Sequence, residues 1–128
     1  MNLLLDTHIA LWALADSPRL PGKARELILE PGNTIWVSAA SVWEIAIKHS
    51  LGRGDMPVSG AQALALFEEA GFLMLAVSGE HAAALAQLPA HHADPFDRML
   101  ASQALTEPLR LLTHDAMLAR YSDTVILV

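Results

Sequence analysis

The segment Leu3-Leu4-Leu5-Asp6-Thr7-His8 joins three consecutive aliphatic residues to an acid, a hydroxyl and an imidazole. Three apolar residues in a row indicate a short strand that is buried on both faces, as in parallel sheets covered by helices. Further aliphatic runs predict four more strands of this kind, at residues 34–37, 72–77, 110–113 and 124–128.

The stretches between these runs are rich in alanine and leucine. Their apolar residues recur at intervals of three and four positions, which predicts helices over 59–70, 80–88 and 96–105. Alternation of buried strands with helices favours a sheet covered on both sides. The sequence therefore predicts an α/β fold, a three-layer α/β/α sandwich around a mostly parallel five-stranded sheet.

Length and composition bound the class of protein. A chain of 128 residues, 53% of them apolar and 17% charged, is typical of one well-packed domain, so we expect residues 1–128 to form a single domain. Cysteine is absent, which excludes disulfides and thiolate metal sites. The longest apolar runs, 9–15 and 72–77, are too short to span a membrane, and no export signal precedes the first strand. We therefore expect a cytoplasmic protein with no membrane partner.

Two acids lie just past predicted strands. Asp6 directly follows the first strand and precedes Thr7, and Asp115 lies two residues after Thr113, the last residue of the fourth strand. Functional groups of parallel sheets gather at the carboxyl ends of the strands. The alternative is that each acid only caps the helix that follows it.

Glu44 lies near the start of the helix expected after the second strand. Two structural interpretations compete with a functional one. Ser41 and Glu44 have the spacing of a capping box, and Glu44 and Lys48 have the spacing of an ion pair worth about 0.2 to 0.5 kcal/mol.

Asp97 extends a helical stripe that otherwise consists of core residues such as Leu100 and Ala101. A buried carboxylate needs a partner or a cation, because burying it alone costs several kcal/mol, roughly. Asp94-Pro95 predicts the helix start, with Asp94 as the cap. In the alternative interpretation Asp97 itself caps the first turn.

Taken together, the four acids point to a metal site. Carboxylates about 4 Å apart repel each other by about 1 to 4 kcal/mol per pair, and a divalent cation removes that cost. An oxygen-only ligand set selects a hard ion, Mg²⁺ or Mn²⁺. Such an ion activates water and stabilises charge on a phosphoryl oxygen, which is the chemistry of phosphodiester hydrolysis.

The segments that carry these acids resemble the PIN-domain nucleases, specifically the VapC-like toxins of bacterial toxin-antitoxin pairs. They are Leu-Leu-Asp-Thr-His at 4–8, Ser-Val-Trp-Glu-Ile at 41–45, His-His-Ala-Asp-Pro-Phe-Asp-Arg-Met-Leu at 91–100 and Leu-Thr-His-Asp at 112–115. The resemblance implies a PIN-like fold and a metal-dependent endoribonuclease that cuts cellular RNA of the tRNA or rRNA class. It also implies a homodimer that is inhibited by a cognate antitoxin.

The resemblance also implies roles for individual residues. The catalytic, metal-binding acids are Asp6, Glu44, Asp97 and Asp115, which hold Mg²⁺ or Mn²⁺ and position the attacking water. Supporting roles fall to Thr7 beside the first acid, Thr113 before the last, and Asp94, which is either a secondary ligand or a helix cap.

Basic residues are scarce. Fourteen acidic and eight basic residues give a net charge of -6, which argues against binding RNA by general electrostatic attraction. We therefore expect a folded RNA to be recognised by shape and loop contacts. The candidates for contacts with substrate phosphates are Arg98, Lys48 and Arg53.

The remaining polar and aromatic residues give weaker signals. The six histidines lack the spacing of a zinc site, although His114 lies beside Asp115. Trp12, Trp36 and Trp43 fall in apolar patterns and are expected in the core, unless one of them lines a dimer or antitoxin surface. The helices near 11–29 and 61–67 are expected to form an apolar groove for an antitoxin helix.

Two other classes remain as alternatives. A receiver-type signalling domain has similar length and a bound Mg²⁺, but the first strand here ends in a single Asp and no Asp follows the third strand. A catalytically silent PIN-like binding module would keep the fold without the activity.

Overall fold

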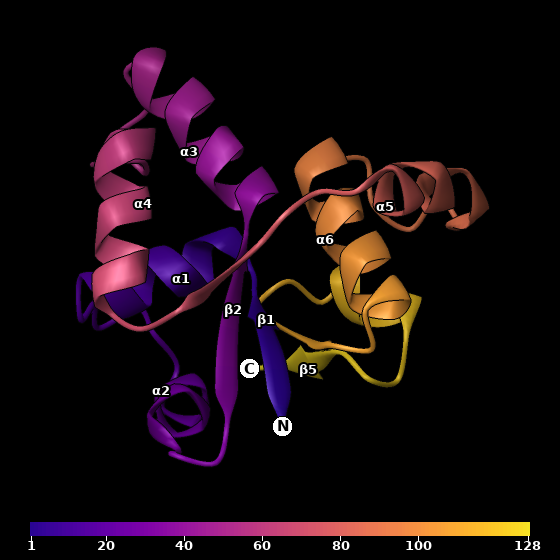
Figure 1. Cartoon of the computed structure of the whole chain (residues 1–128), viewed down its shortest axis with the longest axis horizontal. Helices are drawn as coiled ribbons and strands as arrows, with labels where there is room; N and C mark the ends of the chain where they lie inside the picture. The colour runs from indigo at the N-terminus through magenta and orange to yellow at the C-terminus, as the bar shows by residue number, and fades with distance from the viewer.

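The computed structural model describes all 128 residues and contains one sheet of five parallel strands in the order β3-β2-β1-β4-β5 (Figure 1). The strands are β1 (Asn2–Leu5), β2 (Thr34–Ser38), β3 (Leu73–Leu75), β4 (Arg110–Thr113) and β5 (Ile126–Leu127). The predicted α/β fold with a parallel sheet is confirmed.

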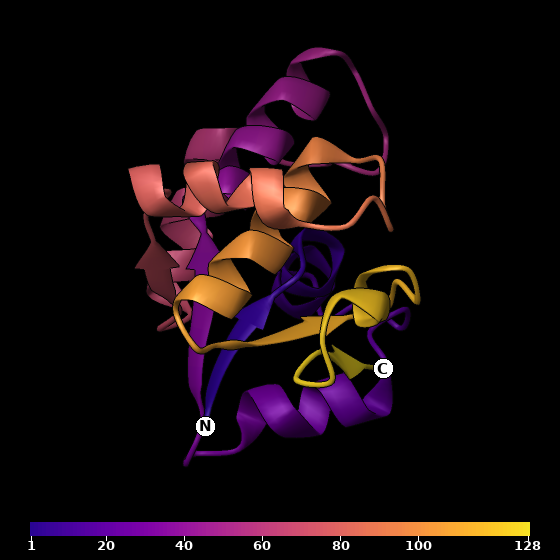
Figure 2. The same cartoon turned by 90° about the vertical axis from the view of Figure 1, so that its right-hand side faces the viewer.

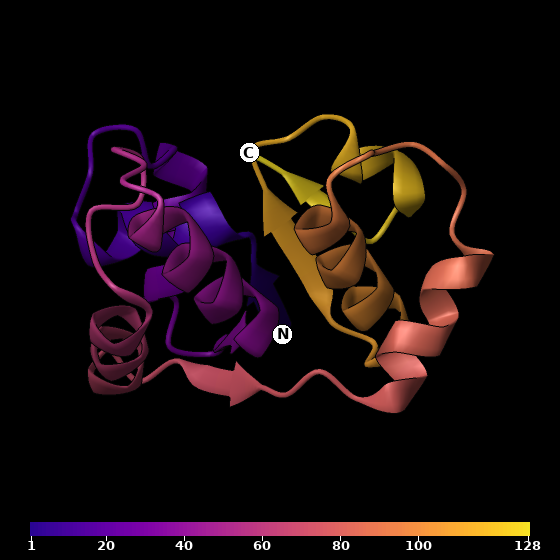
Figure 3. The same ribbon diagram turned by 90° about the horizontal axis from the view of Figure 1, so that it is seen from above.

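Six α-helices and two short 3-10 helices connect the strands. They are α1 (Thr7–Leu14), α2 (Gly22–Leu29), α3 (Ala39–Ser50), α4 (Gly60–Glu69), α5 (Gly79–Ala84), η1 (Leu85–Gln87), α6 (Pro95–Thr106) and η2 (Leu118–Tyr121). Seen from above, α1 to α4 gather on one side of the molecule and α5 and α6 on the other (Figure 3).

The core has two parts, one on each face of the sheet. Side chains of a strand alternate between faces, so Leu3 and Leu5 join the cluster under α1, α2 and α4. Leu4 points the opposite way and packs with α6, through residues such as Leu100. Figure 2, viewed from the α6 side, shows α6 in front of the strands. Burial of β1 on both faces explains why it reads as an uninterrupted aliphatic run.

The register of the sheet aligns the ends of the central strands. Leu5 of β1 lies opposite Val37 of β2 and opposite Leu112 of β4. Residues that follow these positions therefore emerge at the same edge. This is the edge to which the sequence assigns its acids.

Several element boundaries differ from the prediction. The edge strands β3 and β5 are shorter than the aliphatic runs at 72–77 and 124–128, and each pairs with one neighbour only. The helix expected over 80–88 divides into α5 and η1, ahead of Pro89. None of the helices combines the length and the apolar character that a membrane-spanning helix needs.

The start of α3 is a further correction. The helix begins at Ala39, and its cap is Ser38, whose hydroxyl accepts a hydrogen bond from the N–H of Ala40 at 3.0 Å. The capping box predicted from Ser41 and Glu44 is therefore wrong.

A buried histidine ties α5 to α6. The Nδ1 atom of His81 accepts the N–H of Ser78, and Nε2 lies 2.8 Å from the carboxylate of Glu107. Ser102 of α6 donates to the carbonyl of His81 at 2.7 Å. These bonds fix the short α5 against the longer helix.

A close contact between α3 and α4 generates a stability prediction. A Cβ added at Gly60 would lie 2.7 Å from the Cβ of Ala46, so we expect Gly60→Ala to destabilise the fold by about 1 to 3 kcal/mol. Gly22→Ala, at the corresponding first position of α2, meets no atom within 4 Å and is the matched control. Chemical denaturation measures both. Equal stability of the two variants would contradict the close contact.

Candidate active site

The acids at the carboxyl edge of the sheet surround one pocket of about 490 Å³. The pocket is strongly polar, and the four proposed catalytic acids all line it. Its lining residues are Asp6, His8, Trp12, Arg19, Glu44, Lys48, Asp55, His92, Asp94, Asp97, His114 and Asp115.

Asp6 follows β1 and is 8% exposed. It occupies the cap position of α1 but makes no side-chain bond to that helix, so the interpretation of Asp6 as a helix cap is wrong. Its Oδ2 accepts a hydrogen bond from the hydroxyl of Thr113 at 2.6 Å. Burial raises the pKa of Asp6, against the opposing effect of that hydrogen bond. Thr113 thus supports the first acid.

The hydroxyl of Thr7 does not have the expected role. It donates to the hydroxyl of Ser41 at 2.8 Å, and so joins α1 to α3 instead of supporting the carboxylate of Asp6. Thr7 is adjacent to Asp6 in the sequence, but it is the first residue of α1 and its side chain contacts α3. The supporting hydroxyl comes from β4.

Glu44 lies on α3 and is 3% exposed. Lys48 donates to its Oε2 at 2.5 Å, so the ion pair predicted from their spacing is present. Oε1 is buried and has no hydrogen-bond partner. A buried acceptor without a partner is costly, and a cation in the pocket would satisfy it.

Asp94 and Asp97 both lie at the start of α6, but they have different roles. Oδ1 of Asp94 accepts the N–H groups of Phe96 at 2.8 Å and of Asp97 at 3.3 Å, so Asp94 is the helix cap and Asp97 is not. Asp97 lines the pocket. Burial first, and then the charges of Asp6 and Asp94, raise the pKa of Asp97 to about 7.

Asp115 follows β4 and makes contacts through both oxygens. Oδ1 accepts the N–H of Met117 at 2.9 Å, a local bond of the kind that a cap makes. Oδ2 lies 2.8 Å from Nε2 of His92. The backbone N–H of Asp115 donates to the hydroxyl of Thr113 at 3.0 Å, so one threonine contacts both Asp6 and Asp115.

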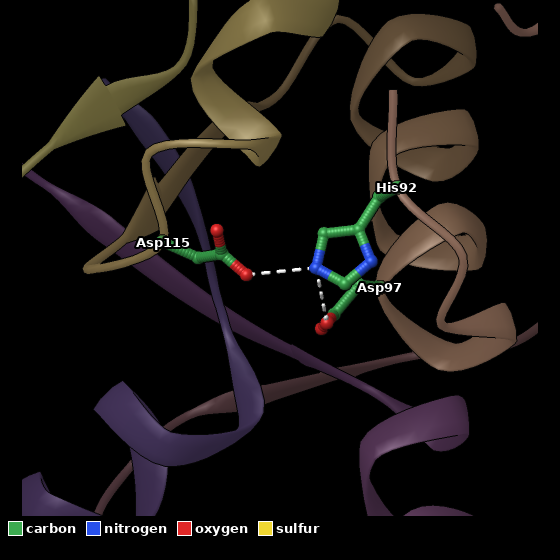
Figure 4. A group of neighbouring side chains, drawn as sticks. All are labelled: His92, Asp97 and Asp115. Carbon is green, nitrogen blue, oxygen red and sulfur yellow. Dashed lines mark hydrogen bonds and ion pairs between the residues drawn. The ribbon is translucent and has the colours of Figure 1, made fainter. Parts of the chain in front are cut away.

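His92 is a site residue that the sequence analysis missed. Figure 4 shows one nitrogen of its ring directed at the carboxylates of both Asp97 and Asp115, and this nitrogen, Nε2, lies 3.2 Å from Oδ2 of Asp97. Burial lowers the pKa of His92, but the hydrogen bond with Asp115 and the charges of Asp97 and Asp115 outweigh it and raise that pKa. His92 lies in a loop, where no periodic pattern indicates the direction of a side chain. Its position just before the Asp94-Pro95 helix start was the only signal.

The basic residues differ from expectation. Lys48 lines the pocket, but Arg53 is paired with Asp55 at 3.2 Å. Arg98 points away from the pocket, since its guanidinium donates to the carbonyls of Pro89 and Leu85 and to the hydroxyl of Tyr121. These bonds hold a loop, which corrects the expectation that Arg98 contacts phosphate. Arg19, which the sequence analysis did not select, lines the pocket instead.

The tryptophans occupy three different environments. Trp43 is 62% exposed, so its assignment to the core is wrong. Its ring packs edge-on against Phe96 at 5.1 Å between centroids, in an apolar hollow of about 310 Å³ next to the acids. Trp12 is half-buried and lies in the pocket between His8 and His114. Trp36 is half-buried against the core on the α6 side.

The pocket fits a hard divalent cation. Its donors are carboxylate oxygens, which Mg²⁺ and Mn²⁺ prefer. Oε1 of Glu44 is an acceptor without a partner, and the pKa of Asp97 is raised by its burial and by the charges of Asp6 and Asp94, which the charge of His92 offsets only in part.

The fold is similar to solved structures of toxin-antitoxin proteins. VapBC2 from Rickettsia felis, solved with a DNA fragment from its promoter, matches with a TM-score of 0.71 and 20% identity over 100% of this chain and 98% of that chain. VapBC-1 from nontypeable Haemophilus influenzae matches with a TM-score of 0.64 and 17% identity over 100% and 97%. FitAcB from Neisseria gonorrhoeae matches with a TM-score of 0.61 and 21% identity over 98% and 96%.

Sequence comparison gives the family. No curated protein matches the chain in sequence. The family model described as PIN domain matches residues 3–123, which include the four acids of the pocket, β2, β3, β4 and all of β1 except its first residue. The chain therefore belongs to the PIN domain family.

Proposed function

We propose that the protein is an Mg²⁺- or Mn²⁺-dependent endoribonuclease that acts as the toxin of a toxin-antitoxin pair in the cytoplasm. The observation that carries the proposal is the single pocket lined by Asp6, Glu44, Asp97 and Asp115, with a buried oxygen of Glu44 left without a partner. Membership of the PIN domain family and the fold shared with VapBC and FitAB proteins support it.

In this proposal the four acids hold the cation, and the most exposed of them, Asp115, also orients water. Asp6 is fixed by Thr113 and Glu44 by Lys48, so both carboxylates are oriented before the cation binds. When bound, the ion supplies Lewis-acid polarisation of a phosphoryl oxygen and lowers the pKa of water. Asp115, whose side chain is 36% exposed, orients the attacking water and accepts its proton.

The substrate in this proposal is a phosphodiester bond of a folded RNA of the tRNA or rRNA class. The cationic side chains that line the pocket are Lys48 and Arg19, and we propose that they contact substrate phosphates. So few cations give little general attraction to nucleic acid. Recognition then depends on the shape of the RNA around the cut site.

The partners in this proposal are a second copy of the chain and a cognate antitoxin. The groove expected between the N-terminal helices corresponds to an apolar hollow of about 110 Å³ that is lined by Leu11, Leu14, Ala15, Pro57, Val58 and Leu66. An apolar helix face is complementary to such a lining. We propose that an antitoxin helix binds there.

One prediction of this proposal concerns RNA cleavage. Asp6→Asn and Asp97→Asn each remove a charge that holds the cation, so we expect each to reduce cleavage of total bacterial RNA by about 100-fold or more. Growth arrest on induction should disappear with the cleavage. Asp123→Asn, an exposed acid outside the pocket, is the matched control and should retain full activity. Undiminished cleavage by the Asp6 variant would overturn the proposed site.

A second prediction concerns pH and metal. The pKa of Asp97 rises from 3.8 to about 7 on folding, so between these values the folded protein holds a proton that the unfolded chain has released. Stability of the metal-free protein should therefore fall as pH rises through about 7, and the raised pKa values of Asp6 and His92 act in the same direction. Asp97→Asn should flatten this dependence, as measured by thermal unfolding.

Mn²⁺ competes with that proton. We expect the ion to raise the melting temperature more at about pH 8 than at about pH 5.5, because the carboxylates must be ionised to bind it. An equal shift at both pH values would show that the ion binds elsewhere.

A third prediction concerns the antitoxin. Leu66→Glu places a charge on the rim of the apolar hollow, and we expect it to weaken binding of the antitoxin encoded by the neighbouring gene by roughly 10-fold or more. Leu105→Glu changes a similarly exposed leucine on α6 and is the control. Titration calorimetry with the purified partner measures both. Loss of binding in the Leu105 variant alone would move the interface to α6.

A further inference from the structure

The loop that joins η1 to α6 holds His92 against the acids. The backbone N–H of His92 donates to the hydroxyl of Tyr121 at 3.0 Å. Arg98 donates to the same hydroxyl at 3.2 Å and to the carbonyl of Pro89 at 3.0 Å. The backbone of the loop is therefore anchored at Pro89 and at His92.

The hydrogen bonds of the ring fix the place of its proton. Nδ1 of His92 lies 3.0 Å from the backbone nitrogen of Asp94, which carries a hydrogen and can only donate. Nδ1 is therefore an acceptor, and as long as it accepts this bond the ring proton lies on Nε2. Nε2 faces Oδ2 of Asp115 at 2.8 Å and Oδ2 of Asp97 at 3.2 Å, and both oxygens are acceptors.

This arrangement is the reverse of that found in a metal-ligating histidine. Such a histidine offers one nitrogen to the ion and donates the N–H of the other to a carbonyl or carboxylate. Three groups here, His92, Asp97 and Asp115, do lie close enough to share an ion, with one ligand atom from each within 4.8 Å of the others. The Nε2 atom, however, presents a hydrogen to the carboxylates and not a lone pair.

We infer that His92 is a positioning residue, whose Nε2–H holds the carboxylates of Asp115 and Asp97 in place for the metal without binding the metal itself. The inference rests on the proposed function, because it concerns the same site. It explains how two like charges from different elements, the turn after β4 and the first turn of α6, are kept side by side (Figure 4).

Both carboxylates depend on this imidazole. Asp97 contacts it through Oδ2, and Asp115, which is 36% exposed against 18% for Asp97, is held besides only by the backbone N–H of Met117 on Oδ1. Without the imidazole, repulsion from Asp97 would favour rotation of the Asp115 carboxylate toward solvent. The ion would then lose one oriented ligand, together with the water that Asp115 positions.

The test is Mn²⁺ binding to the full chain, measured by calorimetry and by pulsed EPR of the loaded protein. His92→Ala removes the donor, and loss of such a supporting bond typically weakens metal affinity by about 10- to 100-fold. His92→Gln keeps an N–H donor and removes the ring nitrogen, so we expect affinity close to wild type. The EPR spectrum of the wild type should show no directly bound nitrogen.

His91→Ala is the matched control. The adjacent ring packs edge-on against Tyr121 at 5.1 Å between centroids and does not line the pocket. We expect this variant to bind Mn²⁺ like the wild type, which separates support of the carboxylates from general loosening of the loop.

Three other outcomes would each contradict the inference, and one of them would also contradict the proposed function. A bound nitrogen that disappears in His92→Gln would make His92 a ligand and overturn the inference alone. Wild-type affinity in His92→Ala would also overturn it and leave the metal site intact. Absence of Mn²⁺ binding by the wild type would overturn the proposed function and this inference together.

Discussion

A buried carboxylate at the end of β1, held by the hydroxyl of Thr113 at 2.6 Å, is the constraint on which the site depends. β1 lies between β2 and β4, so a residue that follows it emerges at the centre of the sheet edge. Asp6 is consequently dehydrated, and burial raises its pKa. The hydrogen bond from the neighbouring strand offsets part of that cost and fixes the direction of the carboxylate.

The other acids meet Asp6 because three separate elements end or begin beside it. Glu44 comes from α3, Asp97 from α6 and Asp115 from the turn after β4. The chain compensates their mutual repulsion from two sides, with the ammonium of Lys48 on Glu44 and the imidazole of His92 on Asp97 and Asp115. This compensation is incomplete, because Oε1 of Glu44 has no hydrogen-bond partner and the pKa of Asp97 is still raised.

The sequence predicted the strands from their aliphatic runs, and it selected Asp6 and Asp115 from their place just past two of those strands. Glu44 and Asp97 were selected from their positions in helices and from the resemblance to PIN-domain nucleases. Strands covered on two faces must be aliphatic, and parallel register brings the residues after them to one edge. It did not predict the contacts of Thr7, Ser41 or Arg98, which depend on how neighbouring elements meet. His92 and the exposed Trp43 were missed for the same reason, since a loop has no periodicity and a helical stripe does not say what lies opposite it.

The close contact between Gly60 and Ala46 has a consequence for how the sequence can diverge. Ala46 lies two residues from Glu44 on α3, and its methyl group fills the space that any side chain at position 60 would need. The two positions therefore share one volume and can change only together. In a set of relatives we expect them to co-vary in size, although neither residue lines the pocket.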